Sequence, residues 1–312
     1  MDGSISMSWP DRILIIANPT SGRGRGKRTA EVVETQLRAA SLAADTSFTE
    51  KAGDAARFAR QACVESGAVR TIVACGGDGT VQEIAAALAK LRAEGLSDEV
   101  NLALAPAGRC NDFARALGVP RHAERIVDII RHGRVQPLDL GKVNDRFFCT
   151  VATLGLDAEV TGFVDRMRMP LRGTPAYLYG ALRVLMRYRP QAVKISGDFA
   201  TIEKPVFIAT TANTALYGGA IPIVPHALPT DGLLDLCVID AMPLYRALPF
   251  IPQALFGRHI RRREVQFIAT RQFRMESATP LELWADGERI GKTPAEISVA
   301  PGIIRVLCPT AR

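Results

Sequence analysis

The sequence predicts a chain of two parts, an α/β domain with a doubly wound parallel sheet and an antiparallel β-sandwich domain with helical insertions. Up to about Val135, short β-branched runs alternate with helix-like stretches, the pattern of parallel strands covered by helices on both faces. After it, many short alternating runs are separated by turn signals, which favours antiparallel strands. We expect domains over residues 1–138 and 139–312, with a last strand that can return to the first domain.

The strand-like runs of the first domain each end near Gly, Asn or Pro and lead into a helix-like stretch. Sheets of this kind bind ligands beyond the carboxyl ends of their strands, so the loops that follow the strands are the candidate site. The predicted strands lie at residues 13–17, 45–49, 71–74 and 101–105.

The second domain is predicted from many short runs, with helical interruptions at about 175–189 and 243–257. Turn signals such as Asn144-Asp145 and Asp286-Gly287 separate several of the runs, as expected for hairpins. The predicted strands lie at residues 135–143, 146–154, 191–196, 206–213, 233–239, 265–269, 281–285, 297–299 and 303–308.

Composition narrows the class of protein. Apolar residues make up 47% and charged residues 23%, which excludes collagen-like and largely disordered chains. The first ten residues lack the regions of a signal peptide, and no run approaches the length of a membrane span, so we expect a cytoplasmic chain. Six cysteines without a CxxC pair indicate reduced thiols rather than disulfides or a zinc site.

The net charge of +7 is concentrated in two segments. Residues 161–190 hold six Arg and one Asp, and residues 256–275 hold six Arg and one Glu, so each segment carries +5. The rest of the chain therefore carries −3. Such concentration argues for an anionic partner, which on charge alone could be nucleic acid, acidic phospholipid or a phosphorylated substrate.

The strongest local signal is the bend Gly76-Gly77-Asp78-Gly79-Thr80 between a predicted strand and a predicted helix. Its glycines let backbone N–H groups approach a bound group closely, and the helix N-terminus behind them favours phosphate. Asp78 alone would repel phosphate, so the loop needs a cation, most simply Mg²⁺, between carboxylate and phosphate oxygens. The alternative is an ordinary glycine-rich turn in which the Asp caps the helix.

The first loop, Asn18 to Lys27, is basic and rich in glycine, but it fits neither common nucleotide motif. A Walker A loop would need Gly in place of Ser21 and Ser or Thr in place of Arg28. The spacing of its glycines, GxGxG, is not the GxGxxG of dinucleotide-binding folds. The loop by itself indicates only flexible, basic contact with phosphate.

Taken together, the motifs resemble the catalytic domain of the diacylglycerol kinase family, which includes bacterial diacylglycerol kinases, YegS-like lipid kinases and sphingosine kinases. The resemblance covers about residues 11 to 308. It rests on NPTSGRGRG, CGGDGTVQEI and PAGRCNDFARALG in that order, then on DGLLD at residues 231–235 and WADGE at residues 284–288. The GGDGT bend alone would also fit NAD kinases and phosphofructokinase-like folds.

The resemblance implies a nucleotide site and metal sites in this sequence. Mg²⁺ is expected at Asp78 and Asp139, and a second, structural Mg²⁺ at Asp231 with the backbone carbonyls of Leu228 and Leu233. Residues expected to contact ATP are Asn18, Pro19, Thr20, Ser21, Gly22, Thr49, Gly76, Gly77, Asp78, Gly79, Thr80, Val81, Gln82, Arg109, Asn111 and Asp112.

The resemblance also implies that Glu288 is the proton acceptor, with Asp286 beside it and Asp78 as the third catalytic carboxylate. Phosphoryl transfer to a hydroxyl needs a carboxylate that orients the hydroxyl and accepts its proton. Without the upstream motifs, Asp286 to Glu288 would be an ordinary hairpin turn followed by an exposed Glu. One position departs from the family, because Arg109 stands where a Thr is usual. The Arg could bind phosphate or fill the pocket.

The first basic segment mixes arginines with apolar residues, which suits docking on an anionic membrane. An ordinary core helix with a solvated Arg face is the alternative. No aromatic motif, zinc finger or helix-turn-helix supports nucleic acid as the partner. The arginines are Arg166, Arg168, Arg172, Arg183, Arg187 and Arg189.

We therefore expect an ATP- and Mg²⁺-dependent lipid kinase that phosphorylates diacylglycerol or a related lipid alcohol at the inner face of the membrane. A NAD kinase is disfavoured because NDFAR at residues 111–115 and the DG-rich second half follow the lipid-kinase pattern. A weakened regulator that binds nucleotide or lipid is the other alternative, motivated by Arg109. The sequence does not determine which lipid is phosphorylated or whether the chain forms a homodimer.

Overall fold

The computed structural model describes residues 12–66, 69–96, 99–166, 174–219 and 221–310. The chain divides into two compact units, Met1–Pro137 with Ile303–Arg312, and Leu138–Gly302. The first is a parallel α/β unit and the second an antiparallel sandwich, so the predicted fold class is confirmed. Two long strands, β5 (Arg134–Val143) and β15 (Ala295–Cys308), each contribute residues to both units.

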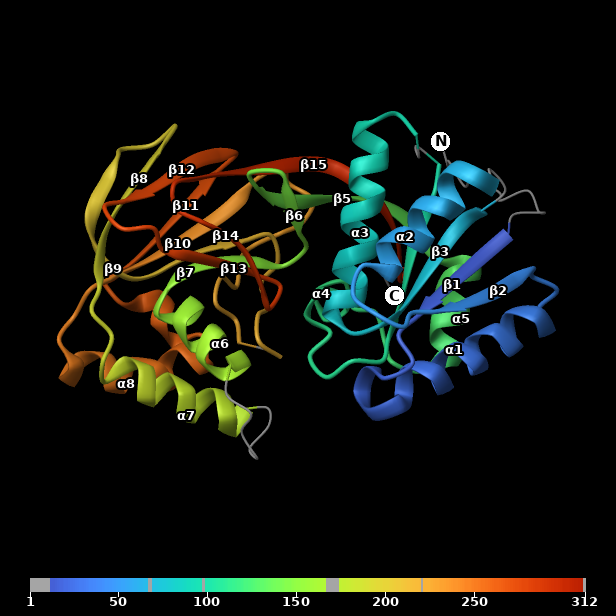
Figure 1. Ribbon diagram of the computed structural model, residues 1–312, viewed down its shortest axis with the longest axis horizontal. Coiled ribbons are helices and arrows are strands. Elements are labelled where there is room, and N and C mark those ends of the chain that lie inside the picture. Colours follow the sequence, from blue (N-terminus) through green and yellow to red (C-terminus); the bar gives the residue numbers. More distant parts are fainter. Residues whose placement is uncertain (1–11, 67–68, 97–98, 167–173, 220, 311–312) are drawn as a thin grey trace. The chain divides into compact units, whose positions relative to one another are not determined.

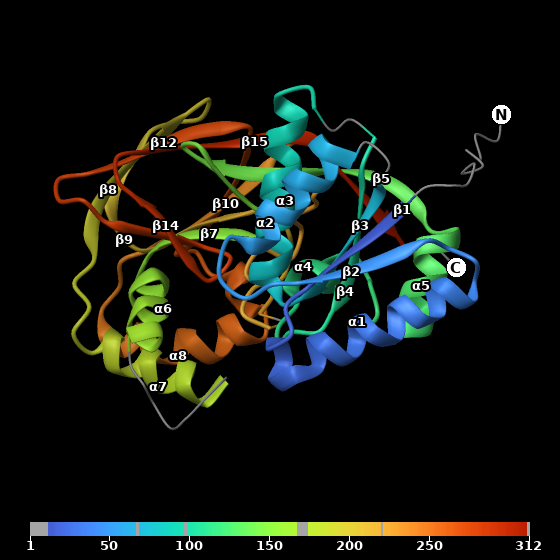
Figure 2. The same ribbon diagram turned by 45° about the vertical axis from the view of Figure 1, so that its right-hand side comes forward.

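The sheet of the first unit has parallel strands in the order β4-β3-β1-β2, and the end of β15 lies parallel beside β4. Figures 1 and 2 show α1 and α5 against one face of this sheet and α2 and α3 against the other. Because both faces are covered, β3 and β4 are buried along nearly their whole length. The strands are β1 (Arg12–Ala17), β2 (Ala44–Phe48), β3 (Val69–Gly76) and β4 (Asn101–Pro106).

The helices of the first unit follow the strands as predicted, with two differences. The first helix ends at Ala39 rather than near Ala44, because Ser41 turns the chain with a φ of 63°. The helix α5 was not predicted. The helices are α1 (Ser21–Ala39), α2 (Asp54–Gln61), the π-turn η1 (Ala62–Ser66), α3 (Asp78–Ala93), α4 (Asp112–Ala116) and α5 (Ala123–His132).

The second unit is built on antiparallel strands in the order β14-β13-β7-β9-β8-β12-β15, with β10 and β11 joined through β9. The strand β8 buries alternate residues, as expected for a strand with one face in the core. The strands are β6 (Arg146–Phe148), β7 (Val151–Gly155), β8 (Gln191–Gly197), β9 (Ile202–Ala212), β10 (Leu234–Asp240), β11 (Val265–Thr270), β12 (Gln272–Ser277), β13 (Glu282–Ala285) and β14 (Glu288–Lys292).

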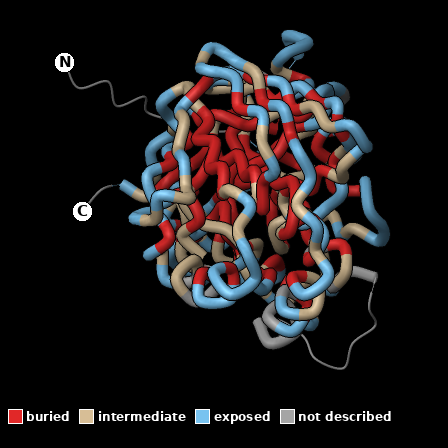
Figure 3. Tube along the Cα trace, turned by 90° about the vertical axis from the view of Figure 1, so that its left-hand side faces the viewer, coloured by how far each residue is buried: buried red, intermediate tan, exposed pale blue. Residues whose placement is uncertain are grey.

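Two apolar cores stabilise the second unit. One fills the sandwich and includes Phe148, Leu236 and Phe273, and the other lies between the sheet and the helices and includes Leu185 and Phe250. Figure 3 shows the buried segments in the interior of the trace and the exposed segments at its periphery. The helices are α6 (Leu156–Arg166), α7 (Thr174–Leu185), α8 (Leu244–Leu255) and the 3-10 turn η2 (Arg258–Arg261).

Several sequence-based boundaries of the second unit were wrong. The predicted strand at residues 146–154 is interrupted at Cys149–Thr150, and the runs at 297–299 and 303–308 belong to the single strand β15. The strands β12 and β14 and the helix α6 were missed. All six cysteines are free thiols, as predicted. Among the described residues, no helix is both long enough and apolar enough to cross a membrane.

Candidate functional site

Three loops of the first unit meet at the carboxyl edge of its parallel sheet, after β1, β3 and β4. The N–H of Asn18 donates to the carbonyl of Cys75 at 2.9 Å. The N–H groups of Ala107 and Gly108 both donate to the carbonyl of Gly76, at 2.8 and 3.0 Å. The first loop is joined to the third by Arg25, whose guanidinium donates to the carbonyl of Gly108 at 3.0 Å. The sequence motifs that lie far apart in the chain therefore form one continuous surface.

Glycine permits this close approach of backbones. A Cβ added to Gly108 would lie 2.4 Å from the Cα of Gly77 and 2.8 Å from Oδ1 of Asn111. A Cβ on Gly22 would lie 2.1 Å from the carbonyl oxygen of Ala107. Any larger residue at Gly22 or Gly108 would push the loops apart, so the contact between the loops depends on these two glycines.

The first loop is shaped by an unusual backbone turn at the start of α1. Gly22, Arg23 and Gly24 have φ angles of 57°, 64° and 88°, so three consecutive residues are left-handed before the regular helix begins. Oδ1 of Asn18 accepts hydrogen bonds from the N–H and the hydroxyl of Thr20, at 3.1 and 2.9 Å. The loop is thus folded back on itself rather than extended.

Asp78 ties the second loop to the third. Its Oδ2 accepts the N–H of Asn111 at 2.8 Å, and its Oδ1 accepts the N–H of Asp112 at 2.6 Å, at the start of α4. The sequence alone indicated only metal and phosphate as partners of this carboxylate. The structure shows that the same carboxylate also anchors the NDFAR segment.

The loop edge fits a nucleotide phosphate with its Mg²⁺. Oδ1 of Asn111 is buried and has no hydrogen-bond partner, and the first turn of α3 leaves backbone N–H groups without partners inside the helix. Each oxygen of Asp78 accepts one N–H, so each retains acceptor capacity. The described part of the chain contains no cluster of three or more His, Cys, Asp or Glu arranged for a metal. A Mg²⁺ ion here would therefore take most of its ligands from phosphate oxygens and water.

The other residues predicted to bind nucleotide differ in which of their groups can contact it. Thr80 and Val81 are buried in α3, so their side chains face the protein. The N–H of Val81 donates to the carbonyl of Gly77 at 3.1 Å, which leaves the N–H of Thr80 as the available contact. Thr49 lies at the same edge, because its N–H donates to the carbonyl of Ala17 at 2.9 Å. Arg109 is exposed, and its carbonyl accepts a hydrogen bond from the guanidinium of Arg121 at 2.7 Å. The exposed guanidinium of Arg109 is accessible to a bound anion.

In the second unit, Asp286 and Glu288 flank a tight turn but have different surroundings. Asp286 and Gly287 have φ angles of 50° and 85°, the conformation of a two-residue hairpin turn. The carboxylate of Asp286 accepts the N–H of Cys149 at 2.6 Å and both the N–H and the hydroxyl of Thr150. Glu288 is exposed at the first position of β14. Asp286 therefore anchors the turn, and Glu288 is the carboxylate presented to solvent.

Asp139 has an anchoring position of the same kind. Its two carboxylate oxygens accept the N–H groups of Gly232 and Gly302, both at 2.7 Å, and its own N–H donates to the carbonyl of Pro229. Asp231, exposed in the same loop, uses Oδ1 to accept the N–H of Leu233 at 3.0 Å. The contacts of Asp139 thus order the loop in which the structural Mg²⁺ was expected.

The structure shows contacts of two residues, Asn213 and His226, to which the sequence assigned no role. The side-chain amide of Asn213 donates to the carbonyls of Asp139 and Cys149, each at 2.9 Å, and so links two anchored segments. Nε2 of His226 lies 3.3 Å from Oδ1 of Asp235, whose pKa is raised chiefly by burial. Each contact joins residues that are not neighbours in the sequence, so no local pattern could have revealed it.

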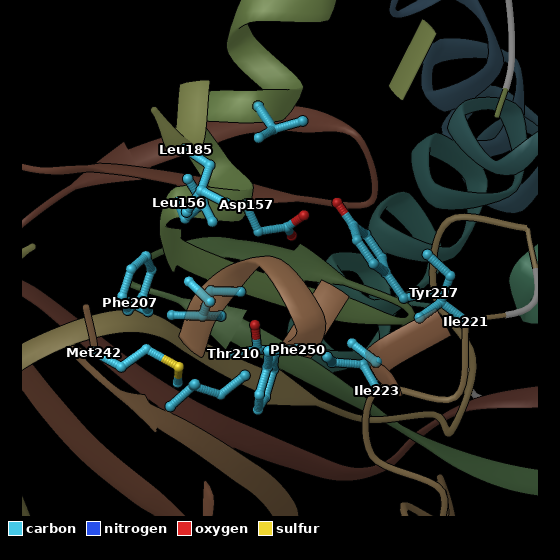
Figure 4. A pocket seen from close by; sticks show the side chains of 15 residues that line it. Leu156, Asp157, Leu185, Phe207, Thr210, Tyr217, Ile221, Ile223, Met242 and Phe250 are labelled. Carbon is cyan, nitrogen blue, oxygen red and sulfur yellow. The ribbon is translucent and has the colours of Figure 1, made fainter. Parts of the chain in front are cut away.

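A largely apolar cavity of about 120 Å³ lies beneath the helices of the second unit. This is about ten times the minimum that holds one water molecule, so the cavity is more than a packing defect. Figure 4 shows Phe207, Met242 and Phe250 lining it, and the oxygens of Asp157 and Tyr217 pointing toward each other at one side. The predictions from sequence included no cavity.

Known proteins match nearly the whole chain. Residues 12–143 match the family model of the diacylglycerol kinase catalytic domain, and residues 150–308 match that of the YegS C-terminal NAD kinase beta sandwich-like domain. A diacylglycerol kinase of Bacillus subtilis (strain 168) is 30% identical over 96% of both chains. A YegS-like lipid kinase of Serratia proteamaculans is 31% identical over 97% of this chain and 96% of its own. A solved structure from Bacillus anthracis described as a diacylglycerol kinase has a TM-score of 0.76 at 25% identity, over 96% of both chains.

Proposed function

The chain belongs to the diacylglycerol kinase family of phosphotransferases with an alcohol acceptor, and on that premise we propose that it transfers the γ-phosphoryl group of ATP, with Mg²⁺, to the hydroxyl of diacylglycerol or a related lipid alcohol. The observation that carries the proposal is the meeting of three glycine-containing loops at one edge of the first unit. Loops of this kind bind phosphate through backbone N–H groups.

The first unit would hold the nucleotide. Backbone N–H groups of the first turn of α3 would face the phosphates. Oδ1 of Asn111 is a buried acceptor without a partner, which suits a cation or a hydroxyl rather than a phosphate oxygen. Asp78 would share the Mg²⁺ that neutralises charge on the transferred group. The exposed guanidinium of Arg109 is free to reach a phosphate as an additional, partly screened contact.

The second unit would hold the lipid. The cavity is lined almost entirely by apolar side chains such as Leu185, Phe207 and Ile223, which suit an acyl chain. Asp157 and Tyr217 supply polar atoms at one side, suited to the glycerol end of the lipid.

Glu288 is the proposed proton acceptor. The lipid oxygen forms a bond to the γ-phosphorus, the bond from that phosphorus to the β-γ bridging oxygen breaks, ADP leaves, and the hydroxyl proton passes to the Glu288 carboxylate. Asp286 is a positioning residue in this proposal, because its hydrogen bonds to Cys149 and Thr150 fix the turn that precedes Glu288.

A transfer assay tests the proposal. Labelled γ-phosphate should appear on diacylglycerol, or on one of monoacylglycerol, ceramide, sphingosine and phosphatidylglycerol, in mixed micelles with ATP and Mg²⁺. Transfer to NAD instead would identify a NAD kinase. Binding of ATP or lipid without transfer would identify a regulator, and transfer that speeds up in Arg109→Thr would show that the native Arg obstructs the site.

A further inference from the structure

The helix α8 has two apolar faces. Ala247, Phe250 and Ala254 line the cavity from inside, at the spacing of one helical face. Leu244, Tyr245 and Leu248 point away from it and are 44%, 72% and 43% exposed. A surface helix normally places polar residues on its outer face. The outer face of α8 is apolar instead, which is typical of a surface that contacts another apolar surface.

The helix α7 repeats this arrangement. Leu185 lines the same cavity, whereas Tyr179 and Leu182, with Met186 directly after the end of α7, are exposed and spaced by three and four residues. Figures 1 and 2 both show α7 and α8 on the same side of the second unit. Both helices therefore line the shared cavity with one set of apolar side chains and expose another set to solvent.

The apolar surface continues past the end of α8 with Phe256 and Ile260, which are 77% and 43% exposed. Eight of the fourteen large apolar side chains that are exposed among the described residues lie on α7, α8 and these flanking positions. We call these eight exposed side chains the docking face.

The docking face is bordered by arginines. Arg183 and Arg187 flank the exposed apolar residues of α7, and Arg258 and Arg261 lie on η2. No carboxylate lies within 4.0 Å of these four guanidinium groups in the described part of the chain, whereas Arg246 is balanced by Glu264 at 3.8 Å. Arg168 and Arg172, which the sequence placed in the same basic segment, lie outside the described residues. The border thus keeps its positive charge.

We propose that the docking face sits on an anionic bilayer, with its apolar side chains among the acyl chains and its arginines at the lipid phosphates. A second copy of the chain is a poorer occupant, because a symmetric contact would bring the same arginines against one another. The proposal rests on the proposed function, since a lipid kinase whose cavity lies under α7 and α8 would draw its acceptor from the membrane that these helices contact.

Vesicle binding without nucleotide tests the docking face separately from catalysis. Binding to phosphatidylcholine vesicles should rise when phosphatidylglycerol is added and fall in about 1 M salt, where the screening length is about 3 Å. Arg183→Glu with Arg187→Glu should weaken binding at least about twentyfold, since each cationic side chain near such a surface contributes about fivefold. Leu248→Ser should weaken it about tenfold.

Matched variants in the first unit serve as controls. Arg131→Glu on α5 and Val32→Ser on α1 change exposed residues of the same types and should leave vesicle binding unchanged. Brominated acyl chains should quench the fluorescence of the indole that Tyr245→Trp introduces. Such quenching would place the docking face inside the bilayer. Salt-independent binding, equal binding to neutral vesicles or equal losses in the controls would overturn the proposal.

The kinase assay separates the two proposals. The Arg183/Arg187 and Leu248 variants should retain transfer to a short-chain diacylglycerol in solution and lose transfer to diacylglycerol in anionic vesicles. If the wild type transfers phosphate in micelles but binds no vesicle, the docking face fails and the proposed function stands. If the chain forms a dimer that these variants dissociate, the face is a contact between copies and the membrane proposal is wrong.

Discussion

The loop edge of the first unit is built from backbone groups, whereas the cavity of the second unit is built from side chains. At the loop edge, the carbonyls of Gly76 and Gly108 and the N–H groups of Asn111 and Asp112 make the decisive contacts. In the cavity, Phe207, Phe250 and their neighbours make the surface. A phosphate needs donors at fixed positions, which short glycine-rich loops supply locally, while an acyl chain needs only apolar volume, which distant residues supply together.

Anchoring aspartates are common to both regions. Asp54, Asp78, Asp139 and Asp286 each accept hydrogen bonds from at least two backbone N–H groups outside their own helix, strand or turn. A hydrogen bond to a charged group contributes about 1.5–3 kcal/mol. Glu288 is exposed at its hairpin. Variants of the anchoring aspartates and of Glu288 therefore distinguish contributions to stability from contributions to catalysis.

The largest effect is expected at Asp78, because its carboxylate has both contributions. Asp78→Ala should reduce transfer below detection and also lower the free energy of unfolding by about 2–4 kcal/mol, since the N–H groups of Asn111 and Asp112 lose their acceptor. Transfer assays and thermal denaturation measure the two effects. Asp128→Ala, at an exposed position of α5, is the control. An unchanged melting temperature would show that Asp78 does not anchor the third loop. Turnover at the wild-type rate would show that the loop of Asp78 does not bind the phosphates.

The second-largest effect is expected at Glu288 and Asp286, whose variants should differ in their effects on activity and on stability. Glu288→Gln should lower kcat by about 10²–10⁴-fold through loss of the proton acceptor, with little change in stability. Asp286→Ala should lower activity and also destabilise the fold by about 2–4 kcal/mol, because Cys149 and Thr150 lose their partner. Glu203→Gln, exposed on β9, controls for surface charge. If Glu288→Gln melts early while Asp286→Ala does not, the two roles are reversed.

The sequence was informative where function depends on local backbone and uninformative where it depends on distant side chains. The bend at Gly76–Thr80 predicted a strand, a turn and a helix, and all three are present. The anchoring of Asp139 to Gly232 and Gly302 joins residues separated by 93 and 163 positions, and no pattern marks such a pair. The cavity draws on α6, α7, α8, β9 and β10, so it too exists only after folding.

A smaller effect is expected when the cavity is filled. Ala254→Phe should raise the KM for long-chain acceptors about tenfold, because the added ring occupies volume that an acyl chain would use. The KM for ATP and transfer to a short-chain acceptor should be unchanged, which distinguishes lost volume from a damaged fold. Equal losses for short and long acceptors would show that the cavity does not hold the acyl chain.

The smallest effect is expected at Asp54, which anchors the loop after Thr49 but carries no proposed chemistry. Hydrogen bonds from the N–H of Glu50, the guanidinium of Arg57 and the N–H of Lys51 lower its pKa from 3.8 to about 2. Because the folded pKa is depressed, the stabilisation is fully present above pH 3.8 and is lost as the pH falls toward 2. Asp54→Asn should therefore melt below the wild type at neutral pH, and the two melting temperatures should converge across that acid range. Asp145→Asn, at an exposed hairpin turn, should follow the wild type at every pH. A difference between Asp54→Asn and the wild type that stays constant down to acid pH would mean that the anchoring does not depend on the charge of the carboxylate.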